Sequence, residues 1–230
     1  MIFPRINNIK KTTLNLIFIT LIIVGFKWIT SYFFFPEETL LIKNLMDIED
    51  TFYLPHILYL SELEFNPNNT FYSYEDKILH IPIYSIMYHS LFYIFFKHGS
   101  FIIIEFISLF IFLYLLLRLF ETFGISQKLS LFLSLLIFFI PDAILILFDN
   151  EKIDFINLII FQNIYNFRVP RPLITSLYFF STLLVLILIL KNKVKQKDNV
   201  YKISLGILLG LCFGSFYYNF VYLYFTFSLI

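Results

Sequence analysis

Five long apolar runs constrain what this chain can fold into more than any other feature. They cover residues 13–35, 99–118, 129–148, 173–190 and 203–225. A helix needs about 20 predominantly apolar residues to cross a bilayer. The chain is 59% apolar and only 14% charged, with a mean hydropathy of +0.81, so a water-soluble fold could not bury its apolar surface. We therefore expect an all-α membrane protein, one multi-pass domain over residues 1–230 with about five transmembrane helices.

The placement of lysine and arginine predicts the orientation, because cytoplasmic loops are enriched in both. A sixth, shorter run covers residues 81–96. If this run does not span, most basic residues fall on one side: Arg5, Lys10, Lys11, Arg118, Lys128, Lys191, Lys193, Lys195, Lys197 and Lys202. If it spans, the lysine-rich segment 191–202 moves to the other side and the balance inverts. We therefore expect a cytoplasmic N-terminus, a long outer loop over 36–98, and a location in a bacterial inner membrane.

The two ends of the chain carry further expectations. The first apolar run follows three basic residues, is too long for a signal-peptide core and has no small-residue cleavage site, so it reads as a retained signal anchor. The last run reaches Ile230 without a polar ending, and we expect this sequence to be the N-terminal part of a longer chain. Gly206, Gly210 and Gly214 recur every four residues, which predicts a helix-packing stripe.

The outer loop is acidic. Between residues 36 and 80 the acids are Glu37, Glu38, Asp47, Glu49, Asp50, Glu62, Glu64, Glu75 and Asp76. Residues 51–65 are amphipathic at helical spacing, which predicts an interfacial helix, and residues 81–96 predict a second one. Asp50 would then either cap the first of these helices or act chemically.

Two chemical roles are open for Glu49 and Asp50. Like charge raises the pKa of a clustered carboxylate, which would suit a general base that takes a proton from a sugar hydroxyl. Alternatively, the pair would hold a divalent cation, Mg²⁺ or Mn²⁺. Asp47 would contribute to the same cluster as a substrate-binding residue.

The run Glu49-Asp50-Thr51-Phe52-Tyr53-Leu54-Pro55-His56 resembles the acidic motif of GT-C type membrane glycosyltransferases, the protein O-mannosyltransferase-like and aminoarabinose-transferase-like enzymes. The later landmarks His80-Ile81-Pro82-Ile83-Tyr84 and Gly99 follow in the order of that group. The resemblance implies an inverting glycosyltransferase that takes its sugar from a polyprenyl-phosphate donor on the extracytoplasmic face. It implies catalytic roles for Glu49 and Asp50 and a substrate-binding role for His56.

Arg168 and Arg171 stand beside two prolines at the outer start of the fourth span. Guanidinium groups pair bidentately with phosphate, so these residues are candidates for binding the donor phosphate. The alternative is that both reach to lipid headgroups. Glu105, inside the second span, is either a functional intramembrane acid or a side chain that reaches the surface. Lys27, beside Trp28, predicts an interfacial anchor.

The rival functions are a non-catalytic membrane subunit, a small transporter, and a polysaccharide polymerase or ligase. A transporter would place ionisable residues near mid-bilayer, whereas the polar residues here cluster at the outer interface. The histidines lack metal-ligand spacing and are expected at the interface. One cysteine, Cys212, excludes an intrachain disulfide.

Overall fold

A computed structural model describes residues 6–34, 48–63, 83–148, 173–191 and 199–228. Within these ranges the chain is almost entirely helical and has no strand. The helices are α1 Ile6–Phe34, α3 Ile48–Ser61, α4 Ile83–Phe96, η1 Lys97–Gly99, α5 Ser100–Thr122, α6 Gln127–Phe148, α8 Leu173–Leu190, α9 Asn199–Ser215 and α10 Tyr217–Ser228.

Three of these helices are long and apolar enough to cross a membrane. The qualifying segments are Lys11–Ile29 of α1, Ser100–Thr122 of α5 and Leu173–Leu190 of α8. They match three of the five runs expected to span. The run 129–148 is helical within α6, although its apolar part with described side chains, Gln127–Ile140, is shorter than a span.

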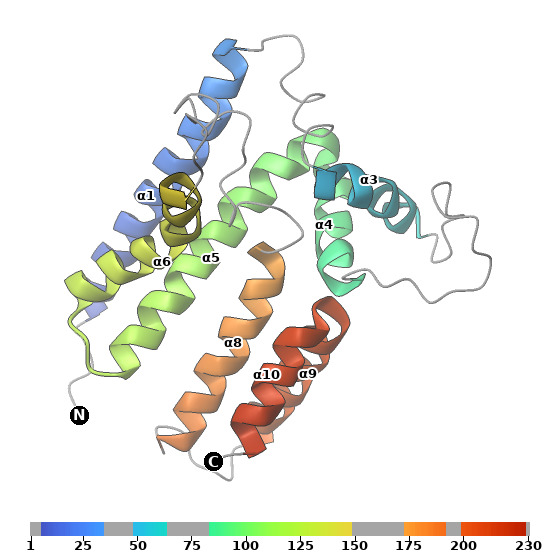
Figure 1. Cartoon of the computed structure of the whole chain (residues 1–230). Coiled ribbons are helices and arrows are strands. Elements are labelled where there is room, and N and C mark those ends of the chain that lie inside the picture. Colours follow the sequence, from blue (N-terminus) through green and yellow to red (C-terminus); the bar gives the residue numbers. More distant parts are fainter. Residues whose placement is uncertain (1–5, 35–47, 64–82, 149–172, 192–198, 229–230) are drawn as a thin grey trace.

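Helix α5 is the centre of the bundle and contacts α1, α4, α6 and α8 (Figure 1). Its apolar side chains repeat at helical spacing, and Leu109, Leu113 and Leu116 are fully buried. A helix that is apolar on several sides needs an apolar neighbour on each of those sides. The core of the bundle therefore lies along α5.

The bundle has two distinct ends (Figure 1). At one end α1 terminates, α5 begins, and α3 lies across α4; we call this the α3/α4 end. At the opposite end α5 terminates and α6 begins. The described basic residues divide unequally between them. The opposite end has Lys10, Lys11, Arg118, Lys128, Lys191 and Lys202, and the α3/α4 end has Lys27 and Lys97.

The two helices expected in the outer loop are present, with shifted boundaries. The helix expected over 51–65 is α3, Ile48–Ser61, and it continues through Pro55. The helix expected over 81–96 is α4, Ile83–Phe96. With 14 residues, α4 is about 21 Å long, too short to cross a bilayer on its own. It buries one face, including Ile86 and Tyr93, and exposes Leu91 and Phe95 on the other.

The expected single helix over 203–225 is instead two helices. Helix α9 ends at Ser215, Phe216 is non-helical, and α10 begins at Tyr217. The break follows the pair Gly214-Ser215, and such pairs are a common cause of sharp helix kinks. The two helices pack side by side, so residues 203–225 do not form one continuous span.

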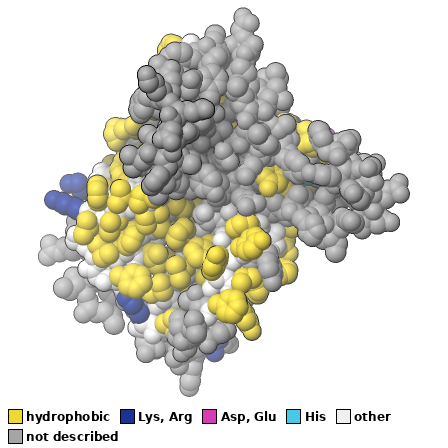
Figure 2. Space-filling view, viewed as in Figure 1, with side chains coloured by type: hydrophobic (Ala, Val, Ile, Leu, Met, Phe, Trp, Pro, Cys, Tyr) yellow, Lys and Arg dark blue, Asp and Glu magenta, His cyan; other side chains and the backbone are white. Residues whose placement is uncertain are grey.

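The outer surface of the bundle is strongly apolar. Figure 2 shows hydrophobic side chains over the face made by α6, α8 and α10, with Lys and Arg at its rim. Phe132, Leu136, Tyr222 and Phe225 are among the large apolar side chains that these helices expose. Such extensive exposure is unusual for a soluble monomer.

Candidate functional site

A buried polar cluster joins α1 to α5 near the α3/α4 end. Lys27 Nζ lies 2.7 Å from Glu105 Oε1, and Trp28 Nε1 donates a hydrogen bond to Glu105 Oε2 at 2.7 Å. Lys27 and Glu105 are each 4% exposed. Both carboxylate oxygens of Glu105 therefore accept hydrogen bonds from two adjacent residues of α1.

Helical spacing explains why these side chains meet. On α1, Leu16, Thr20, Val24 and Trp28 are buried at four-residue intervals and form one face. That face packs against α5, whose Glu105 is buried one position after Ile104. Lys27 lies beside Trp28 and reaches the same carboxylate, because a lysine stem is long enough to extend along its own helix.

His89 of α4 brings a third helix to the cluster. It is fully buried, its Nε2 lies 3.3 Å from Ser100 Oγ, and its ring contacts that of Phe101 edge to face. Burial lowers the pKa of His89 to about 3, and the nearby Glu105 carboxylate acts in the opposite direction. His89 is therefore neutral at physiological pH. Its Nδ1 has no hydrogen-bond partner within the described ranges, and Ser85, one turn earlier on α4, also has an unpaired buried hydroxyl there.

The acidic pair of the sequence motif falls at the start of α3. Glu49 and Asp50 are the second and third residues of that helix, so Asp50 lies inside the first turn and is not the residue before it. The described part of the structure gives the backbone but not the side chains of this pair. Asp47, Arg168 and Arg171 lie outside the described residues altogether, and their roles stay predictions.

His56 belongs to the packed face of α3. Its side chain is buried, and Nδ1 has no hydrogen-bond partner among the residues described. Burial lowers its pKa below the ordinary value. An interfacial position and a substrate-binding role for His56 both stay predictions.

The described side chains form no metal-binding group of three or more His, Cys, Asp or Glu residues. Glu49 and Asp50 are the candidates for a cation, and their side chains lie outside the described part of the structure. A Mg²⁺ or Mn²⁺ ion held by this pair therefore stays a prediction.

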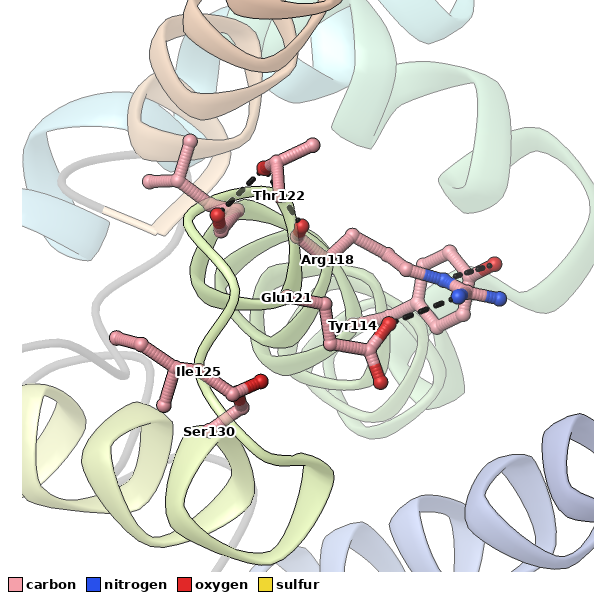
Figure 3. A network of polar contacts seen from close by, with 7 residues as sticks. Tyr114, Arg118, Glu121, Thr122, Ile125 and Ser130 are labelled. Atoms are coloured by element: carbon pink, nitrogen blue, oxygen red, sulfur yellow. Dashed lines mark hydrogen bonds and ion pairs between the residues drawn. The ribbon is translucent and has the colours of Figure 1, made fainter. Parts of the chain in front are cut away.

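A second polar network lies at the opposite end of α5 (Figure 3). Arg118 donates to the hydroxyl of Tyr114 at 3.1 Å and to the carboxylate of Glu121 at 2.9 Å, and it stacks over the Tyr114 ring. Lys191 at the end of α8 donates to the carbonyl oxygen of Thr122 at 2.8 Å. Arg118 and Glu121 are partly exposed, as expected for helix ends at a polar surface, and their spacing within one helix suits a structural role.

The sequence singled out Lys27, Trp28 and Glu105 but not their association. The sequence predicts an interfacial anchor at Lys27, beside Trp28, and leaves Glu105 as either a functional intramembrane acid or a side chain that reaches the surface. The three meet because α1 and α5 are neighbours, although Lys27 and Glu105 are 78 residues apart in the chain. An intramembrane acid and base in separate apolar runs are a signal for such a pair.

Comparison with known proteins gives no relative: no family model, no curated protein and no solved structure matches this chain.

Proposed function

We propose that this chain is a multi-pass integral membrane protein with its α3/α4 end on the extracytoplasmic side. Two observations support this. The helices expose large apolar side chains over a broad face, and the described basic residues gather at the opposite end, as cytoplasmic ends do. A bacterial inner membrane is the location that fits this orientation.

We further propose that the α3/α4 end transfers a sugar from a polyprenyl-phosphate donor. The observation that carries this proposal is the position of α3. It follows the first apolar helix, has Glu49 and Asp50 in its first turn, and packs on α4, the helix that precedes α5 in the chain. This order of elements is the one that the resemblance to GT-C glycosyltransferases implies. Glu49 or Asp50 would serve as general base or as metal ligand.

The depth of the buried charges argues against a transporter. Glu105 is the sixth residue of α5, about 8 Å along the helix from its start. Lys27 is seven residues before the end of α1 at Phe34, about 10 Å along the helix. Transporters hold their coupling charges near the bilayer midplane, whereas both of these charges lie within about two turns of the same end of the bundle.

Transfer assays on membranes that contain the full-length protein test the enzymatic proposal. Radiolabelled polyprenyl-phosphate mannose, glucose and aminoarabinose serve as donors, and the wild type is compared with Glu49→Gln and Asp50→Asn. Loss of a general base lowers rates by about 10²–10⁴-fold, so at least one variant is expected to fall in that range.

Glu62→Gln is the matched control. Glu62 is an exposed acid just beyond the other end of α3, and its neutralisation is expected to leave transfer unchanged. Equal transfer by the wild type and both motif variants would contradict the catalytic assignment. Absence of transfer with every donor would favour a non-catalytic membrane subunit.

A further inference from the structure

The Lys27–Trp28 pair has the form of a receptor for an anion with two oxygens. An ammonium and an indole N–H, on consecutive residues, each hold a different oxygen of one carboxylate at 2.7 Å. A phosphate group presents the same features, a negative charge shared between oxygens a short distance apart. The Glu105 carboxylate therefore stands where an external phosphate would be held.

His89 lies close enough to this carboxylate to be influenced by its charge. Its Nδ1 is buried and has no hydrogen-bond partner in the ranges described. Native proteins rarely leave a buried polar atom unpaired, and such an atom calls for an explanation. An imidazole N–H at this position would donate to an anion bound next to Glu105.

The cluster lies within about two helical turns of the α3/α4 end. Lys27 is seven residues before the end of α1, and Glu105 is five residues after the start of α5. The hydrocarbon core is about 30 Å thick, so groups within two turns of a helix end reach the headgroup region by modest adjustments of long side chains.

We propose that Lys27 and Trp28 bind the phosphate group of a lipid, and that Glu105 occupies this receptor as an internal counter-ion until the lipid phosphate displaces it. Lys27 is neutralised in both states, so the exchange does not leave its charge unpaired. The identification of this lipid with the sugar donor rests on the proposed function, whereas the binding itself requires no transfer reaction.

The single tryptophan of the chain reports on this exchange directly. Trp28 is the one tryptophan in the sequence, so intrinsic fluorescence follows the site without a label. The 230-residue chain in a phosphate-free maltoside detergent is titrated with farnesyl phosphate, farnesol and inorganic phosphate. We expect a saturable change with farnesyl phosphate, no change with farnesol, and a much weaker response to inorganic phosphate.

Two variants are expected to change affinity in opposite directions. Lys27→Met removes the cation and is expected to abolish the response, whereas Lys27→Arg retains it. Glu105→Gln removes the internal competitor and is expected to tighten farnesyl phosphate binding by about tenfold, equivalent to about 1.4 kcal/mol. A purely structural ion pair predicts no such gain. Lys97→Gln, a change at an exposed cation on the same end, is the control and is expected to bind as the wild type does.

The wild-type titration decides the matter even if a variant fails to fold. No saturable response from the wild type overturns the proposal, and so does weaker binding by a folded Glu105→Gln variant. An equal response to inorganic phosphate would overturn the assignment to a lipid. Binding without sugar transfer would leave this inference standing and reject the proposed enzyme, and transfer without a Trp28 response would do the reverse.

Discussion

The ammonium of Lys27 is buried against the carboxylate of Glu105. Removing either charge would leave the other buried without its partner in this ion pair. Lys27→Met would leave Glu105 buried without the ammonium that now contacts Oε1. Breaking one side of a buried ion pair typically costs about 3–5 kcal/mol. We expect the thermal unfolding temperature in detergent to fall substantially.

Lys11→Met is the matched control for that change. Lys11 is an exposed lysine on the same helix, and surface substitutions usually change stability by less than about 0.5 kcal/mol. Equal destabilisation by both variants would show that the buried ion pair contributes no more to stability than an exposed lysine does.

His89 gives the fold a defined pH dependence. Its pKa is about 3 in the folded protein and 6.5 as the ordinary value, so the unfolded chain binds the extra proton between these two values. The contribution of neutral His89 to the free energy of unfolding is therefore complete above pH 6.5, and it is lost as the pH drops towards 3. The contribution of one histidine has a slope of up to about 1.4 kcal/mol per pH unit.

Chemical denaturation at several pH values measures this slope. His89→Gln removes the titrating group and is expected to give a shallower dependence, while His56, whose pKa is also lowered, remains in both proteins. An unchanged slope in the variant would contradict the neutral, buried state of His89.

Residue-scale roles were only partly predictable from the sequence. The anomalous character of Lys27 and Glu105 was visible, because charges in apolar runs stand out. Their pairing was not, because periodicity describes one helix at a time and says nothing of which helices become neighbours. The burial of His89 was missed for the same reason: its partners Ser100 and Phe101 lie on another helix.

At the scale of elements, α4 and α9 are held together by a close approach at Gly214. A Cβ atom on Gly214 would collide with the ring of Tyr84, whereas Cβ atoms on Gly206 and Gly210 would meet nothing within 4 Å. The glycine stripe expected from the sequence therefore packs at one of its three positions within the described structure.

Alanine substitution separates the three glycines. Gly214→Ala is expected to destabilise the protein by about 1–3 kcal/mol through overpacking. Gly210→Ala, in the same helix, is expected to stabilise it by up to about 1 kcal/mol, because alanine favours the helix and meets no neighbour. Thermal unfolding of both variants in detergent checks this, and equal effects would refute the α4–α9 contact.

Hydropathy predicted the long helices well and the short ones less well. The runs that became α5 and α8 were found within a few residues, since a sustained apolar stretch has few alternatives. Hydropathy predicts one helix over 203–225, because a hydropathy average over many residues is insensitive to a single non-helical residue such as Phe216. The lengths of α3 and α4 were approximated, because interfacial helices end where tertiary contacts end and not where the apolar character stops.

At the scale of the molecule, α5 connects two ends of different chemistry. One end has the buried cluster of Lys27, Trp28 and Glu105, and the other has the partly exposed network of Arg118. The orientation that we propose assigns the first to the extracytoplasmic side and the second to the cytoplasm. Both functional proposals depend on this assignment, because a lipid-linked donor is used on the outer face.

Cysteine labelling in intact cells tests that orientation most directly. Single cysteines are introduced at exposed positions of opposite ends, Glu62→Cys after α3 and Lys128→Cys at the start of α6, in a background where the buried Cys212 is replaced by serine. A membrane-impermeant maleimide is expected to label position 62 in intact cells and position 128 only after permeabilisation. The reverse pattern, with position 62 protected and position 128 labelled from outside, would contradict the account.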